Sequence, residues 1–181
     1  MRPVEIDKVF ELSADILICL YGGMVSPKLC EKEIKAQLEP YDFLVSFEST
    51  VGVDTHLSKK RYFQIVASDE RIKDIGNTAC CLISIHAFEN LKKISVYKNI
   101  ENQSPVKFLY HLRNGSAHGN VFHFYSREKF VPPKPITWNG KTIDANLQSK
   151  PVFPDFFSAG DFGHLFEDIS KEIKKHAHYH V

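Results

Sequence analysis

The side chains of this sequence best suited to chemistry are those of Arg113 and His118, at the two ends of a short segment. A guanidinium binds phosphate through a planar fork of N–H donors, and an imidazole takes up or releases a proton near neutral pH. Asn114 follows the arginine and can orient a substrate. Together these groups suit a reaction in which a proton is transferred while a cation stabilises developing negative charge.

This segment is expected near the end of a helix. Ser104 and Pro105 suit a helix start, and the Gly119-Asn120 pair suits a helix stop. On a helical wheel of about 100° per residue, Arg113 falls on the apolar side of the helix. A buried charge without a partner is too costly to keep, so we expect a carboxylate, a phosphate or a partner chain beside Arg113.

Three polar side chains share a second strip of the same helix. Tyr110, Asn114 and His118 are spaced four residues apart and therefore project from one side. Tyr110, whose ring can stack on a planar group, and Ser116 are the predicted substrate-binding residues. Two plainer readings stay open: Tyr110 can pack on the protein, and His118 can be a helix-end residue that suits the helix dipole.

The composition indicates one globular domain over residues 1–181, with 43% hydrophobic and 25% charged residues. The net charge of +1 excludes a general positive field, so any contact with nucleic acid must be local. The sequence has four cysteines, no CxxC pair, no N-terminal signal pattern and no apolar stretch long enough to span a membrane. We therefore expect reduced cysteines and a cytoplasmic protein.

Hydrophobic spacing predicts helices in the first half of the chain, with an uncertain stretch between them. The first helix is expected from Ile6 to Leu20, ended by Gly22-Gly23, and a second from Ser26-Pro27 towards Pro40. Segments 43–45 and 62–66 can be strands or buried helical turns, and 52–58 is expected to be a loop. A long helix, capped at Ser68, is expected to run towards Asn99.

The second half is expected to add a small β-hairpin to the helices. Residues 121–125 have strand composition, and an Asn-Gly turn within residues 137–143 has alternating flanks typical of a hairpin. A last helix is predicted over 158–176. Its apolar side consists of Phe162, Leu165, Phe166, Ile169 and Ile173.

An arginine followed by a polar residue and then by His118 near a helix end resembles the signature of HEPN domains. The segments downstream are similar to one bacterial HEPN branch with a hairpin insertion; they are His118-Gly119-Asn120, the aromatic strand, the Trp138-Asn139-Gly140 turn and the helix from Asp161 to Ser170. The resemblance implies an all-α, up-and-down bundle. It also implies a two-fold dimer with the motif helices face to face.

The resemblance further implies an activity. Many HEPN domains are metal-independent endoribonucleases that act as toxins or in phage defence beside a nucleotidyltransferase-like antitoxin, and others bind only nucleotides or partners. We therefore assign His118 as general acid or base, Arg113 as phosphate clamp and Asn114 as orienting group, without a cofactor. Two copies of His118 in a dimer would supply both acid and base. The alternative is a non-catalytic module in which Arg113 holds a phosphate or a carboxylate.

Histidines elsewhere are weaker candidates for a site. His176, His178 and His180 alternate at the end of the sequence and can either bind a transition metal or form a frayed tail. His164 lies four residues before Asp168, a spacing of metal pairs and of ordinary surface contacts alike. His86 is expected to be a hydrogen-bonded core residue. No P-loop, dinucleotide, nucleophile-elbow or HExxH motif occurs.

Overall fold

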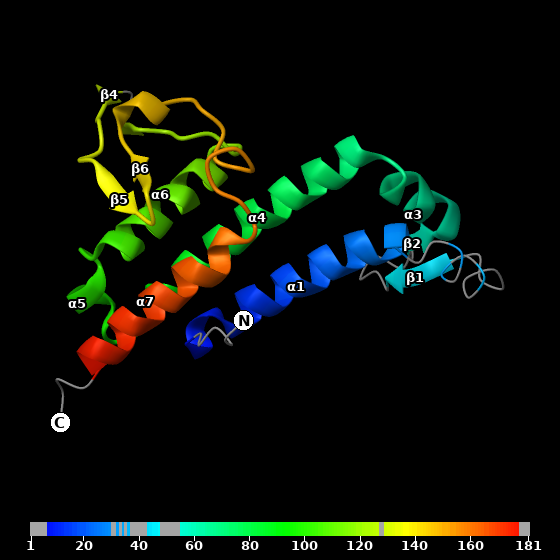
Figure 1. Ribbon diagram of the computed structural model, residues 1–181, viewed down its shortest axis with the longest axis horizontal. Helices are drawn as coiled ribbons and strands as arrows, with labels where there is room; N and C mark the ends of the chain where they lie inside the picture. The colour runs from blue at the N-terminus through cyan, green and yellow to red at the C-terminus, as the bar shows by residue number, and fades with distance from the viewer. Residues whose placement is uncertain are drawn as a thin grey trace. The chain divides into compact units, whose positions relative to one another are not determined.

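The computed structural model describes residues 7–29, 32, 34, 36, 43–47, 55–126 and 129–177. Within these residues the protein is mainly helical and carries small two-stranded antiparallel sheets, which confirms the predicted fold class (Figure 1). The chain divides into two compact units, residues 1–18 with 77–181 and residues 19–76. Helices α1 (Lys8–Leu29) and α4 (Asp69–Leu91) contribute to both. That residues 1–181 form one domain stays a prediction.

The unit of residues 19–76 contains a strand pair followed by a helix. Strand β1 (Phe43–Phe47) pairs antiparallel with β2 (Thr55–Ser58), and α3 (Lys59–Val66) follows directly. The hydroxyl of Ser58 caps α3 by accepting a hydrogen bond from the Arg61 amide at 3.1 Å. Residues 43–45 are thus strand and 62–66 helix. The loop predicted over 52–58 is wrong for 55–58, because these residues pair with β1; residues 52–54 lie outside the described residues.

Helix α1 is longer than the sequence predicted. It continues through Gly22-Gly23 and Ser26-Pro27 to Leu29, so the predicted stop and the predicted second start are both wrong. Glycine in a helix costs up to about 1 kcal/mol and proline about 3 kcal/mol, which weakens a helix without forbidding it. Most of the stretch from residue 30 to Pro40 lies outside the described residues.

Helix α4 begins as predicted and ends earlier. The Ser68 hydroxyl accepts a hydrogen bond from the Arg71 amide at 3.3 Å, as a cap should. The helix ends at Leu91 rather than near Asn99, because the Lys93 amide donates to the Asn90 carbonyl and tightens the turn. The chain then forms the short helix α5 (Tyr97–Ile100) and α6 (Ser104–Ala117).

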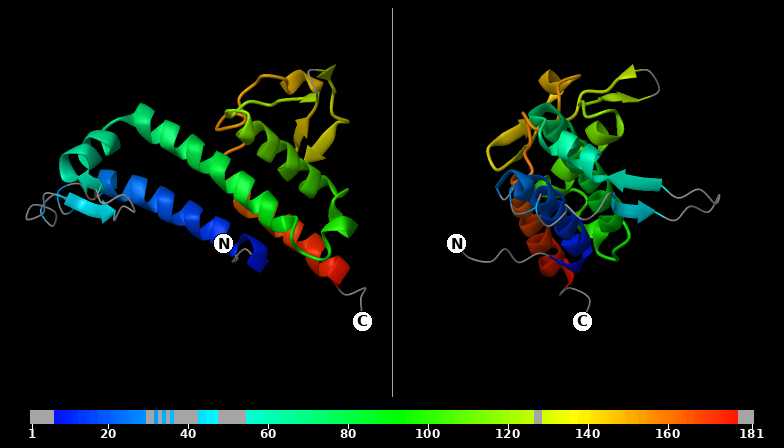
Figure 2. Two further views of the ribbon diagram at one scale, coloured as in Figure 1. Left: turned by 180° about the vertical axis from the view of Figure 1, so that it is seen from behind. Right: turned by 90° about the vertical axis from the view of Figure 1, so that its right-hand side faces the viewer.

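The segment after α6 forms two small hairpins on one side of that helix (Figures 1 and 2). Its elements are β3 (Tyr125–Ser126), β4 (Lys129–Phe130), β5 (Ile136–Trp138), β6 (Lys141–Ile143) and the 3₁₀ helix η1 (Ala145–Leu147). Asn139 and Gly140, between β5 and β6, have φ angles of 45° and 74°, as a tight hairpin turn requires. The predicted hairpin is confirmed. Of the strand predicted over 121–125, only Tyr125 lies in a strand.

The core of the larger unit is aromatic. Helix α7 (Asp161–Ala177) buries its predicted apolar side, and Phe162 stacks among neighbouring rings. The Trp138 indole packs against Phe108 of α6 and donates a hydrogen bond to the Asp168 carboxylate at 3.0 Å. The phenylalanines with less than 2% exposure are Phe10, Phe108, Phe122, Phe153, Phe157, Phe162 and Phe166. This packing holds α6 in a fixed position.

Candidate functional site

Helix α6 starts and stops where the sequence predicted. Pro105 lies in its first turn, and the chain leaves it through Gly119 and Asn120, whose φ angles are 79° and 67°. The amide of His118 still donates to the carbonyls of Asn114 and Gly115 at 3.2 Å. His118 is therefore held at the exposed end of a well-formed helix.

Gly115 marks a close approach of the chain to itself. A Cβ atom at this position would lie 2.5 Å from Cγ2 of Val152 and 3.1 Å from the carbonyl oxygen of Val121. The amide of Val121 also donates to the Gly115 carbonyl at 3.1 Å. The absence of a side chain at Gly115 therefore makes room for the protein's own segments at Val121 and Val152.

Ser116 faces the interior of the protein. Its side chain is only 8% exposed, its hydroxyl donates to the Leu112 carbonyl at 2.8 Å, and it lies 2.6 Å from the hydroxyl of Ser84 on α4. A substrate cannot reach a hydroxyl that is already enclosed and hydrogen-bonded. We therefore leave Ser116 out of the proposed site, because its position does not fit the substrate-binding role assigned from the sequence.

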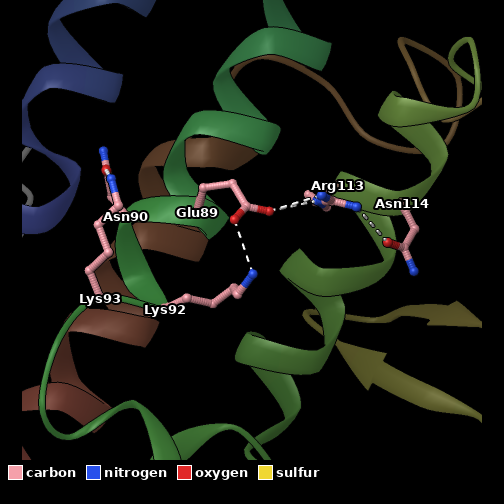
Figure 3. A network of polar contacts seen from close by, with 6 residues as sticks. All are labelled: Glu89, Asn90, Lys92, Lys93, Arg113 and Asn114. Atoms are coloured by element: carbon pink, nitrogen blue, oxygen red, sulfur yellow. Dashed lines mark hydrogen bonds and ion pairs between the residues drawn. The ribbon is translucent and has the colours of Figure 1, made fainter.

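Arg113 has the carboxylate partner that its place on the helix required. Its Nε and Nη2 donate to Oε1 of Glu89 on α4 at 3.1 and 2.9 Å, and its Nη1 donates to Oδ1 of Asn114 at 3.3 Å (Figure 3). The other oxygen of Glu89 accepts from Lys92 at 3.0 Å. These bonds lower the pKa of Glu89, chiefly the one from Lys92, so the carboxylate stays charged at neutral pH.

The guanidinium of Arg113 keeps room for a second anion. Three of its five N–H groups donate to Glu89 and Asn114, and within the described part of the chain the other two donate to nothing. The arginine side chain is 33% exposed, so part of it is open to solvent. Glu89 and Asn114 thus orient the guanidinium without using all of its donors.

His118 has a second histidine against it. Its ring and that of His123 lie 3.9 Å apart between centroids and are inclined by 23°. Hydrogen bonds between Asn120 and the backbone of Phe153, both at 2.9 Å, fix the turn that brings His123 back. Partial burial, the nearby His123 and the charge of Arg113 lower the pKa of His118 below its usual value of 6.5, in that order, which favours the neutral ring at pH 7.

Tyr110 lies on the same helix as the other predicted site residues and is 43% exposed. One side of its ring contacts Phe88 at a centroid distance of 5.5 Å and the neighbouring ring of His111 at 5.1 Å. Both sequence readings of this tyrosine therefore apply in part. The ring packs on the protein and still presents a large surface to solvent.

Two residues of the site were missed by the sequence reasoning. Glu89 lies on α4, a different helix from Arg113. The sequence indicated only that some carboxylate should lie near the arginine, and it did not identify Glu89. His123 follows His118 by five residues, after the turn at Gly119 and Asn120. Such a turn can bring the chain back beside the helix end, so it was the signal in the sequence that could have identified His123. Both contacts depend on tertiary structure.

The remaining histidine candidates have ordinary surroundings. Nδ1 of His86 lies 2.9 Å from the Ser13 hydroxyl, and its Nε2 accepts from Asn90 at 3.0 Å, as predicted for a core histidine. His176 contacts the Glu172 carbonyl within α7, while 178 and 180 lie outside the described residues. Among the residues that the structure describes, no group of three potential ligands could hold a metal ion. None of the helices in the same residues is long and apolar enough to cross a membrane.

The fold and site together describe a mainly helical protein with a partly exposed arginine and an exposed histidine near the end of one helix. A family model for HEPN pEK499 p136 matches residues 3–176, almost the whole chain. The protein therefore belongs to the HEPN family, which confirms the resemblance seen in the sequence. No curated protein and no solved structure matches the chain significantly.

Proposed function

We propose that this HEPN protein is a metal-independent endoribonuclease in which His118 transfers the proton and Arg113 binds the reacting phosphate. The observation that carries the proposal is that one helix end holds an exposed histidine, His118, and a partly exposed arginine that Glu89 already orients. A neutral imidazole at pH 7 can accept the proton of a ribose 2′-hydroxyl. An arginine already aligned by Glu89 meets the developing charge without first having to be ordered.

The proposed reaction needs no group from outside the protein and the RNA. The 2′-oxygen attacks phosphorus, its proton passes to His118, and the 5′-oxygen leaves with a proton from an acid. The products are a 2′,3′-cyclic phosphate and a free 5′-hydroxyl. Arg113 stabilises the charged phosphorane, and Asn114 orients the arginine through the bond at 3.3 Å.

A homodimer that brings two copies of His118 into one cleft is part of this proposal, since the second copy can act as the acid. A cytoplasmic location, a toxin or defence role, and a nucleotidyltransferase-like antitoxin are further parts, supported by family membership alone.

A second candidate function is a non-catalytic module that binds nucleotides. The net charge of +1 favours it, because affinity for long RNA comes from many positive contacts, whereas one arginine is enough to hold a single phosphate. In that case binding depends on Arg113 and survives the loss of His118. Catalysis instead requires both residues.

The deciding experiment follows cleavage of mixed cellular RNA by the purified protein in EDTA. We expect cyclic-phosphate ends with the wild type and a rate lower by about 10²–10⁴-fold in His118→Ala, the usual contribution of acid–base catalysis. His164→Ala is the matched control, since that histidine is exposed on α7 and outside the site. Absence of cleavage, or equal cleavage by wild type and His118→Ala, rejects the enzyme.

A further inference from the structure

A pocket lies beside α6, next to residues of that helix that are not among its buried ones. Its volume is about 500 Å³, which is within the usual range for small-ligand sites. One wall comes from the first half of α6 and includes Lys107, Tyr110 and His111. The opposite wall is the segment that enters β5, with Lys134 and Thr137. All these residues belong to the larger unit.

The charged groups that line the pocket are both cations. Lys107 and Lys134 contribute two ammonium groups, and no aspartate or glutamate lines it. Neither lysine forms an ion pair with any of the residues that the structure describes, whereas Lys92, Lys98 and Lys171 all do. Two like charges without a carboxylate between them favour an anionic ligand.

The rest of the lining suits a base or a ribose. Tyr110 offers a ring that is partly exposed, and contacts with the rings of Phe88 and His111 hold it in place. Burial, with a smaller effect of Lys107, lowers the pKa of His111 to about 4, so this histidine adds a polar group and no charge. An aromatic ring next to a phosphate-binding cation is the usual means of holding unpaired nucleotides.

We propose that this pocket binds a nucleotide of the single-stranded RNA that flanks the cleaved bond, with its phosphate on Lys107 and Lys134 and its base on Tyr110. The inference rests on the proposed function and deepens it. Tyr110 and His118 are eight residues apart on one helix, which is about 12 Å of rise. Stacked nucleotides advance about 3.4 Å each along a strand, so some three or four of them connect the pocket to His118.

The test measures binding of a short 2′-O-methyl oligoribonucleotide, which cannot be cleaved because its 2′-oxygens carry no proton. The double variant Lys107→Ala/Lys134→Ala should bind it more weakly. The slope of log K against log salt concentration should become shallower by about 0.7, because both lysines contact the same phosphate and each phosphate contact on a single strand contributes roughly 0.7. Lys98→Ala/Lys171→Ala removes two positive charges outside the pocket, so it is the charge-matched control and should leave the slope unchanged.

The tyrosine provides a second, independent measurement. Tyr110→Leu should weaken binding at least roughly five-fold, whereas Tyr110→Phe keeps the ring and the affinity. On cleavable RNA the lysine double variant should raise KM and leave kcat almost unchanged, because neither lysine touches the reacting atoms.

The outcomes separate this inference from the proposed function. Binding that depends on the pocket in a protein that never cleaves RNA supports the pocket and rejects the enzyme. Cleavage with an unchanged salt slope and KM in the lysine double variant overturns the pocket alone. Pocket-dependent binding of adenosine monophosphate that the oligonucleotide cannot displace also overturns it, since the pocket would then hold a free nucleotide.

Discussion

Helix α6 has two sides with different surroundings. The inner side carries Leu112, Gly115 and Ser116, all buried and all in contact with other parts of the same chain. The outer side carries Asn114 and His118, which remain partly or largely exposed. Arg113 lies at the boundary, since its guanidinium is bonded to a carboxylate and its side chain is one-third exposed.

The difference shows how a small helical domain can present reactive groups accurately. The inner side fixes the position and rotation of the helix through packing and hydrogen bonds. The outer side is therefore not needed to position the helix. Changes on the inner side should therefore alter stability, and changes on the outer side should alter chemistry or assembly. The three predictions below test that separation, from the largest expected change in stability to the smallest.

The largest expected change concerns acid and His111, at the edge between the two sides. Burial lowers the pKa of His111 to about 4, against about 6.5 for the exposed residue, so the unfolded chain takes up the proton first. The stability contributed by the neutral ring is complete above pH 6.5 and is lost as the pH falls towards 4. The difference of about 2.5 pH units corresponds to about 3 kcal/mol.

The measurement is urea unfolding at pH 7 and at pH 4.5. Wild type should lose about 2–3 kcal/mol more than His111→Gln between the two pH values, because glutamine does not titrate. His164→Gln, on an exposed position of α7, should behave like wild type. Equal losses in wild type and His111→Gln would show that His111 is not held neutral by burial.

A smaller change is expected from Gly115→Ala. The added methyl group meets Val152 at 2.5 Å and the Val121 carbonyl at 3.1 Å, and crowding of this kind costs about 1–3 kcal/mol. The higher helix propensity of alanine returns up to about 1 kcal/mol. We expect a net loss of about 1–2 kcal/mol in the free energy of unfolding, with RNA cleavage by the folded protein unchanged.

A double-mutant cycle identifies the cause of that loss. Val152→Ala removes the atom that the new methyl group meets, so the double variant Gly115→Ala/Val152→Ala should be more stable than the sum of the single changes implies. Strict additivity would mean that the two residues do not compete for one space. Unfolding by urea, followed by circular dichroism, provides all four free energies.

The sequence predicted much of this arrangement where the signal was local. Pro105 and Gly119 correctly bounded α6, the Asn139-Gly140 turn correctly placed a hairpin, and the apolar spacing of α7 matched its buried side. The predicted ends of two helices were wrong, because local residue preferences did not decide where those helices stop. Helix α1 runs through Gly22-Gly23 because glycine only weakens a helix, and α4 ends early because the chain turns at Leu91.

In the candidate site, too, the sequence predicted local features and missed contacts between separate elements. The helical wheel required an anion beside Arg113 and the structure supplies Glu89, although no spacing rule links residues on different helices. The wheel could not show that Ser116 is enclosed by Ser84, nor that His123 returns to stack on His118. Those contacts follow from how α4 and the segment after α6 pack, which depends on the whole core.

The smallest expected change in stability, and the most specific test of the outer side, is Ala117→Trp. Of the three small residues between Asn114 and His118, only Ala117 is exposed, because Gly115 and Ser116 pack against the protein's own chain. If two motif helices meet across a two-fold axis, a bulky side chain at this position enters the interface twice. We expect Ala117→Trp to keep its helical content and unfolding free energy, to sediment as a monomer at micromolar concentration and to lose RNA cleavage. Ala117→Ser, which adds little volume, should remain dimeric and active. A wild-type protein that sediments as a monomer and still cleaves RNA would show that one chain supplies both proton-transfer groups, and His123, already stacked on His118, would then be the side chain to substitute next.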